Sequence, residues 1–272
     1  MSLQFLLVML LALPLRAEDS ADADDWSPRV TAVSGDVTVF EKGSEEGLPA
    51  EAETPLEDGD RIEVGEGAAA EVALEPDSLL ELGEKTSFTV GSTAREASWF
   101  SLDLGSFVAK LKSFAEGRSR LEVRTPTAVA AVRGTEFAVQ VGEDGATDVA
   151  VYDEGKVAVT ASEDGGGETL LSAQKELTLR RGERAGKPHA LKRMKARRER
   201  LVRLRERRAQ LRKNWRRMNP NQRREARQRW LGSMRERMKN MPPKRRQQFK
   251  KRVQKAGPRK GPPHPPRRGG RP

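Results

Sequence analysis

The sequence predicts a mainly β domain, packed as a sandwich, jelly roll or short solenoid, followed by a basic α-helical tail and a disordered C-terminus. Three observations predict this order. Apolar and polar residues alternate with period two up to about residue 179, helix formers and arginine take over after Gly186, and Gly, Pro and Arg dominate residues 256–272. A period of two is typical of half-buried strands, whereas one of 3.6 is typical of amphipathic helices.

An apolar run opens the chain, from Leu3 to Leu15. It is shorter than the roughly 20 residues that span a bilayer, and the small residue Ala17 follows it. We therefore interpret residues 1–17 as a cleaved signal peptide and 18–27 as an acidic linker, with an uncleaved N-terminal anchor as the alternative. This interpretation locates the protein outside the cytoplasm, in the periplasm or secreted.

Residues 28–182 are predicted to form the β domain, with roughly a dozen short strands. Alternating runs such as 36–40, 61–64, 136–141 and 156–160 are separated by turn sequences such as 143–145 and 153–155. Asp58 and Asp60 flank Gly59 in another such sequence. We interpret it as a turn, with a calcium site as the alternative, because an isolated Asp-Gly-Asp is typical of turns.

Residues 183–190 are expected to be a linker, and 191–255 to form basic amphipathic helices. Asn219, Pro220 and Gln222 predict a helix start with a capping box, and this helix should end near Asn240. A Met-x-Pro unit occurs at 218–220 and again 23 residues later at 241–243, which predicts helices broken at prolines. Apolar side chains with heptad spacing mark the first helix: Met194, Leu201, Leu204, Leu211, Trp215 and Met218.

Charge divides the chain at the same place. Residues 187–272 hold 34 Lys and Arg against four acids (+30), and the rest holds 17 against 36 (−19), which together give the net +11. Such asymmetry predicts an anionic partner for the tail, and the chain's own front domain qualifies.

Few residues offer catalytic chemistry. The chain has no cysteine, and its two histidines, His189 and His264, both lie beside proline in the basic part. No paired-carboxylate site, catalytic triad or phosphate loop is evident, so we predict no enzyme activity, no cofactor and no metal site.

The strand-rich part resembles the FecR domain family between about Val30 and Leu179. The most diagnostic stretch is Val123–Phe137, which contains Thr125-Pro126-Thr127-Ala128 and Arg133-Gly134-Thr135. The other matching segments are Val33–Val37, Leu56–Ile62, Pro76–Leu82, Leu104–Val108, Thr147–Tyr152 and Glu154–Val157.

In the namesake proteins of the family, this domain lies outside the cytoplasmic membrane, and a membrane helix links it to a cytoplasmic segment that controls a sigma factor in iron-siderophore signalling. This sequence shows no internal membrane span and no such segment. The resemblance implies an extracytoplasmic bacterial β domain that acts by contacting other molecules. The tail is also similar to arginine-rich Trp/Met-x-Pro segments of bacterial envelope proteins.

Candidate partner-binding residues lie in both parts. In the β domain, the default interpretation of the Val123–Phe137 stretch is a structural turn, and the alternative is that its edge binds a partner. The tail suits anionic lipid, lipopolysaccharide or another polyanion, and export disfavours nucleic acid. The candidates are Arg133, Thr135 and Glu136 in the β domain, and Arg197, Arg208, Trp215, Arg216, Arg217, Arg223, Arg224 and Trp230 in the tail.

Three functions follow. The first is an envelope binding or scaffold protein, whose β domain recognises a protein or glycan while the tail holds an anionic surface. The second is a signalling regulator that is autoinhibited when the tail folds over the front domain. The third is a cytoplasmic protein that binds nucleic acid.

Overall fold

The computed structural model describes residues 25–94, 97–112, 121–162 and 167–255. The predicted signal peptide, most of the acidic linker and the predicted disordered C-terminus lie outside these ranges. No helix within them has the length and apolar character needed to cross a membrane.

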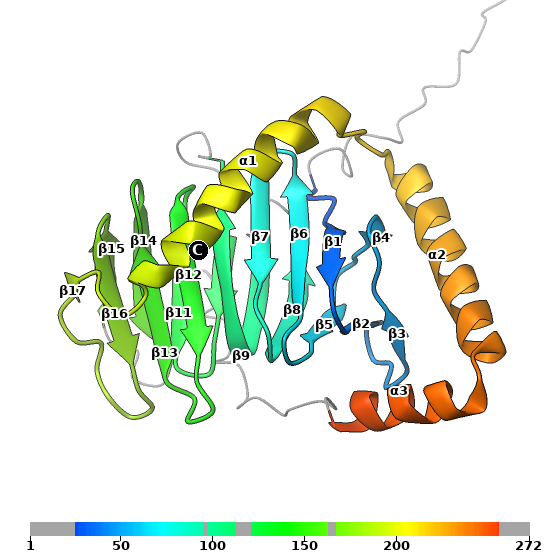
Figure 1. Cartoon of the computed structure of the whole chain (residues 1–272). Helices are drawn as coiled ribbons and strands as arrows, with labels where there is room; N and C mark the ends of the chain where they lie inside the picture. Colours follow the sequence, from blue (N-terminus) through cyan, green and yellow to red (C-terminus); the bar gives the residue numbers. More distant parts are fainter. Residues whose placement is uncertain (1–24, 95–96, 113–120, 163–166, 256–272) are drawn as a thin grey trace, which may run out of the picture.

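Two layers of strands face each other (Figure 1). Neighbouring strands in layer A pair antiparallel, in the spatial order β4, β1, β6, β7, β9, β12, β13, β16, β17. The bounds are β1 Arg29–Ser34, β4 Thr54–Pro55, β6 Ala69–Glu75, β7 Ser78–Leu82, β9 Trp99–Lys110, β12 Glu136–Val141, β13 Thr147–Val151, β16 Lys175–Leu179 and β17 His189–Ala190.

Layer B has the order β3, β2, β5, β8, β9, β10, β11, β14, β15, and only its β9–β10 pair is parallel among the strands described. The bounds are β2 Val37–Phe40, β3 Gly47–Pro49, β5 Arg61–Val64, β8 Thr86–Ser92, β10 Leu121–Arg124, β11 Ala128–Val132, β14 Lys156–Ala161 and β15 Thr169–Ser172.

Strand β9 belongs to both layers. Its residues 99–104 pair within layer B, and its residues 105–110 pair within layer A. Gly105 lies at the change of layer with φ +88°, and a β-carbon there would collide with Thr86. Only glycine satisfies both conditions, because L side chains avoid positive φ.

The main core fills the space between the layers. Phe88 of layer B packs edge-on against Phe107 of layer A, with ring centroids 6.0 Å apart, and Phe107 packs against Phe137 at 5.6 Å. Each of these positions alternates along its strand with an outward residue, as the period of two predicted. The fold is therefore a sandwich, one of the three predicted architectures.

Among the described residues, three α-helices follow the sandwich: α1 Arg198–Asn214, α2 Pro220–Asn240 and α3 Pro243–Lys255, with a short 3-10 turn η3 Lys195–Arg197 before α1. The capping box is present, because Asn219 accepts from the Gln222 backbone N–H and Gln222 accepts from that of Asn219. The helices break at the prolines and α2 ends at Asn240, as predicted.

The number of strands and two boundaries differ from the sequence prediction. The described residues contain 17 strands rather than roughly a dozen, because short pairings such as β4 and β17 carry no alternation long enough to detect. The expected linker at 183–190 ends in β17, which pairs with β16 through Glu176 and His189 and extends layer A. The first helix begins at Arg198 rather than near residue 191.

Candidate functional site

The outer face of layer A carries a strip of small and aliphatic side chains. One residue from each of five adjacent strands contributes to it, and none of the five is exposed to solvent: Ala73, Leu79, Val108, Ala138 and Ala150. The alternate residues of the same strands point into the sandwich core, so these strands are buried on both faces. We call this surface the apolar strip.

Helix α1 covers the apolar strip and runs across the strands (Figure 1). Leu201 and Leu204 of α1, together with Met194 just before it, are almost fully buried against the strip. The Tyr152 hydroxyl donates to the Met194 carbonyl oxygen at 2.8 Å. The heptad-spaced side chains of the tail therefore pack on a sheet of the same chain, and Leu211 and Trp215 are partly buried beside them.

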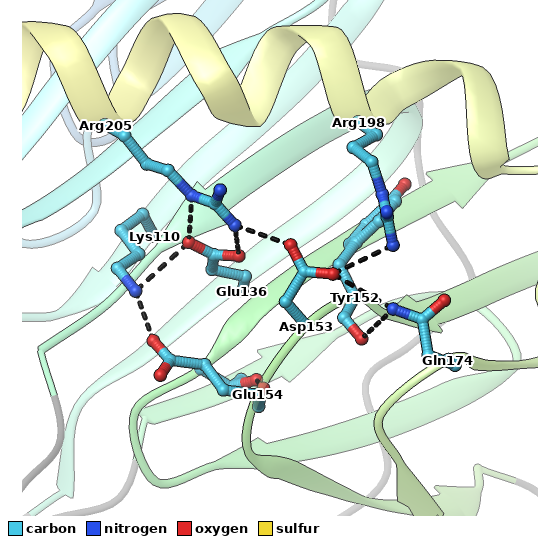
Figure 2. A network of polar contacts seen from close by, with 9 residues as sticks. Lys110, Glu136, Tyr152, Asp153, Glu154, Gln174, Arg198 and Arg205 are labelled. Atoms are coloured by element: carbon cyan, nitrogen blue, oxygen red, sulfur yellow. Dashed lines mark hydrogen bonds and ion pairs between the residues drawn. The ribbon is translucent and has the colours of Figure 1, made fainter.

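Arginines along one side of α1 bind carboxylates at one margin of the strip. Arg205 makes a two-pronged ion pair with Glu136 and also binds Asp153 at 2.7 Å. Arg198 binds Asp153 at 2.9 Å. Figure 2 shows this network, in which Lys110 approaches Glu136 from β9 at 3.1 Å. Further along the helix, Arg208 and Arg212 both bind Asp77.

A second set of arginines binds the opposite margin. Arg200 donates to the Glu81 carboxylate at 2.7 Å, and Arg207 binds Glu71 at 3.2 Å. Arg197 reaches Ser106 at 3.0 Å and also Gln140. The helix thus presents cations, then leucines, then cations, to a face that presents carboxylates, then alanines, then carboxylates.

The electrostatics at Glu136 favour its ionised form. Its side chain is 1% exposed, and burial by itself raises its pKa. Hydrogen bonds from Arg205 and Lys110 outweigh burial, so the pKa of Glu136 lies below its ordinary value. Hydrogen bonds to Glu136 and Asp153 raise the pKa of Arg205, and burial raises the pKa of Tyr152 to about 12.

The segment that leads into α1 is held at Glu176. Its carboxylate accepts the backbone N–H groups of Arg193 and Met194, both at 3.0 Å. Burial by itself would raise the pKa of Glu176. The hydrogen bonds from these backbone donors have the larger combined effect, so the net shift of the pKa is downward. The entry of the helix is therefore fixed by a buried carboxylate of β16.

Helix α2 is anchored at the other end of the sandwich by Arg227. Its guanidinium binds both oxygens of Asp60, at 3.0 and 2.7 Å, donates to the Pro55 carbonyl at 2.6 Å, and lies 5.0 Å from the ring centroid of Trp230. Asp60 is 1% exposed, and burial raises its pKa while Arg227 opposes that shift. Asp58 accepts from the backbone N–H of Thr93. Both carboxylates of the Asp-Gly-Asp sequence thus have structural partners, and Gly59 supplies the turn with φ +90°.

The predicted β-domain candidates have different environments. Arg133 is exposed between β11 and β12, whereas the Thr135 hydroxyl donates to the Glu154 carbonyl and is buried. Glu136 binds Arg205 of the tail. Partner binding at these positions stays a prediction, but Glu136 already has a partner within the chain.

Most of the predicted tail candidates face the sandwich. Arg197 and Arg208 contact layer A, Trp215 lies 3.8 Å from the Arg29 guanidinium, and Trp230 packs in the main core. Arg223 donates to the Trp26 carbonyl at 3.1 Å. The remaining candidates, Arg216, Arg217 and Arg224, are exposed.

Several residues of the site were not identified from the sequence. They include Arg200, Arg205 and Arg227 in the tail and the carboxylates Glu81 and Asp153. Asp60 was considered only as a turn residue or a calcium ligand. One available signal was the segment Ala69–Leu74, whose apolar residues occupy both registers of a strand and indicate burial on both faces. Within the residues described, no group of three or more His, Cys, Asp or Glu is placed to hold a metal ion.

Comparison with known proteins finds a family match for part of the β domain. Residues 60–158 match the family model described as FecR protein. No curated protein sequence matches the chain.

Two crystal structures of a "putative anti-sigma factor" from Parabacteroides distasonis ATCC 8503, at 2.50 and 1.65 Å resolution, are similar in structure with a TM-score of 0.41 and 18% identity. The alignment covers 50% of this chain and 62% of that chain, so this chain spans less than two thirds of that protein.

Proposed function

We propose that the protein is a non-enzymatic, extracytoplasmic regulatory protein. Its FecR domain has a docking face for an arginine-rich amphipathic helix, and α1 occupies this face until a protein partner replaces it. The observation that carries the proposal is the matched order of charge and apolar surface on α1 and layer A. The FecR domain supports a regulatory role in signalling.

The two parts of this interface contribute differently. Burial of Met194, Leu201 and Leu204 is worth about 1.5–3 kcal/mol each, as an upper estimate. The ion pairs between half-exposed side chains, such as Arg198 with Asp153, are worth at most about 1 kcal/mol each. Apolar contact therefore holds the helix on the sheet, while the arginines select its orientation and make its docking sensitive to salt.

The decisive experiment releases α1 and tests whether the face then binds the same helix in trans. The variant Leu201→Asp with Leu204→Asp removes the apolar contact. The variant Val202→Asp with Ala209→Asp adds the same charge on the outward side, where both residues are exposed. A labelled peptide of residues 191–218 should bind the first variant and neither the second variant nor the natural protein.

Hydrogen exchange adds a second readout. In the natural protein, the amides of α1 should exchange faster than those of β9 and β12, because a regulated helix opens without unfolding the sandwich. Equal protection of α1 and the core strands would contradict the proposal, and so would an undocked but folded variant that does not bind the peptide.

A second candidate is the envelope scaffold, whose β domain recognises a protein or glycan while the tail contacts an anionic surface. It is favoured by exposed tail cations with no carboxylate beside them among the described contacts, such as Arg224, Lys239 and Lys251. Fractionation of cells that express charge-reduced tail variants tests it. Truncation at residue 186 is a poor test, because it would also uncover the apolar strip.

A further inference from the structure

Helix α3 is held less firmly than the other two helices. Within 243–254, whose side chains are described, no residue of α3 is buried, and Phe249 and Val253 are half-buried. In contrast, α1 buries Leu201 and Leu204, and α2 buries Trp230 and Met234.

Few polar contacts join α3 to the sandwich. Arg252 binds Asp36, and the side chains of this pair are 52% and 65% exposed, so the pair adds little to stability. Arg246 donates to the carbonyls of Lys239 and Met241 and therefore holds the junction with α2 rather than the sandwich.

Apart from Arg252, the exposed cations of α3 have no ion-pair partner among the described residues. The helix has no acidic residue, and the exposed cations Lys244, Arg245, Lys250 and Lys251 face no carboxylate among the described ion pairs. The arginines of α1, by comparison, are matched to carboxylates on the sheet. The cations of α3 are therefore available to an external anion.

The apolar side of α3 borders an open space. A cavity of about 280 Å³ lies between the helix and β3. Its apolar lining comes from Met238, Phe249 and Val253, and its charged lining comes from Glu45, Glu46 and Lys250. Phe249 and Val253 are four residues apart and lie on the same side of the helix. Arg245 and Lys250 flank this side, given 3.6 residues per turn. An apolar stripe bordered by cations is typical of a helix that lies in a membrane interface.

We propose that α3 is a membrane-contact helix that binds the surface of an anionic phospholipid bilayer. Its lysines and arginines bind the lipid phosphates, while Phe249 and Val253 leave the crevice beside β3 and enter the interface. A nucleic acid would use the same cations but would offer no apolar layer for these two side chains. The inference rests on the scaffold function proposed above and names its anionic surface.

Binding of the full chain to vesicles tests the charge requirement. The natural protein should bind vesicles of phosphatidylcholine with phosphatidylglycerol and not vesicles of phosphatidylcholine alone. Each charge removed from α3 should weaken binding about fivefold. The test variant is Lys244→Gln, Arg245→Gln, Lys250→Gln and Lys251→Gln, and its matched control is Lys187→Gln, Lys195→Gln, Lys213→Gln and Arg216→Gln.

The test variant should therefore bind at least about 100-fold more weakly, and the control should lose much less. Equal losses in the two variants would show that the net charge, rather than α3, determines binding, and would overturn the proposal.

Insertion is tested separately from charge. A Phe249→Trp variant should show a blue shift of tryptophan emission with anionic vesicles. Because the chain has no cysteine, Glu46→Cys and Lys250→Cys, whose positions line the cavity, can be bridged by a short bis-maleimide. In the Phe249→Trp background the bridge should abolish the blue shift, whereas the same protein capped separately at both cysteines should retain it.

An unchanged blue shift in the bridged protein would overturn the proposal. So would binding to a DNA oligonucleotide that depends on the same four cations when vesicle binding does not. If the natural protein does not bind vesicles but still fractionates with the envelope, the inference fails while the scaffold function stands. If neither is seen, both fail.

Discussion

The buried ion pair between Arg227 and Asp60 gives the most direct test of how the tail is held. We consider Arg227→Met, which keeps the length of the side chain and its packing on Trp230 but removes the charge. Asp60 then stays buried without its guanidinium partner, and the Pro55 carbonyl loses a donor at 2.6 Å. Breaking a buried pair from one side costs about 3–5 kcal/mol.

The Glu57 backbone N–H still donates to Asp60 at 3.0 Å, so the lower part of that range applies to the carboxylate. Adding about 1 kcal/mol for the unpaired carbonyl, we expect the free energy of unfolding at neutral pH to fall by about 4 kcal/mol. Urea unfolding followed by circular dichroism measures this loss. The double variant Arg227→Met with Asp60→Asn should recover most of it, because no buried charge is then left.

The pH dependence gives an independent check. Burial already raises the pKa of Asp60 in the folded protein and Arg227 opposes the shift, so the substitution should raise this pKa further. A folded pKa above the unfolded value means that the penalty is complete above the folded pKa and disappears as pH falls to the ordinary value of 3.8. The deficit of the variant should therefore shrink in acid. A loss below about 1 kcal/mol, or one that is the same at every pH, would refute the reasoning.

Three other substitutions probe the sandwich and its contact with α1. Glu136→Gln should lower the free energy of unfolding by about 2 kcal/mol at neutral pH. It should also reduce the loss of stability in acid, because hydrogen bonds from residues such as Arg205 hold the pKa of Glu136 below its ordinary 4.5 despite burial. That stabilisation is present above pH 4.5 and lost as pH falls through the folded pKa, so equal acid titration curves of unfolding would contradict it. Ala138→Leu should lift α1 and cost about 1–3 kcal/mol, seen as faster hydrogen exchange in α1 than the natural protein shows there, with exchange in β9 changed much less. Gly91→Ala should displace the Trp99 ring, which occupies the position of the added β-carbon, and a change in near-ultraviolet circular dichroism checks this.

Local features of the chain were predictable because they depend on neighbouring residues. The capping box at Asn219 and Gln222 needs only four consecutive positions, and the helix breaks follow from proline. The strands around Val139 and Val157 follow from alternation over five or six residues. These features have the predicted structure.

The pairing of arginines with carboxylates was not predictable in the same way. Arginine occurs on every side of α1, so the sequence does not distinguish Arg205, which binds Glu136, from its outward neighbours. That choice depends on which strands lie side by side in layer A, and the strand order depends on contacts between distant residues. The opposite charges of the two parts did predict that the tail qualified as a partner of the front domain, and its ion pairs with layer A show that contact.

The direction of α1 across the strands has a consequence for the order of assembly. A 17-residue helix is about 25 Å long, and strands spaced about 4.8 Å apart place five of them beneath it. The apolar strip takes one residue from each of β6, β7, β9, β12 and β13, so it exists as one surface only after all five are paired. We therefore expect α1 to pack on the sheet only after these five strands have paired during folding. Protection of α1 would then report that these five strands are paired, because a sheet that lacks any of them offers the helix no continuous surface.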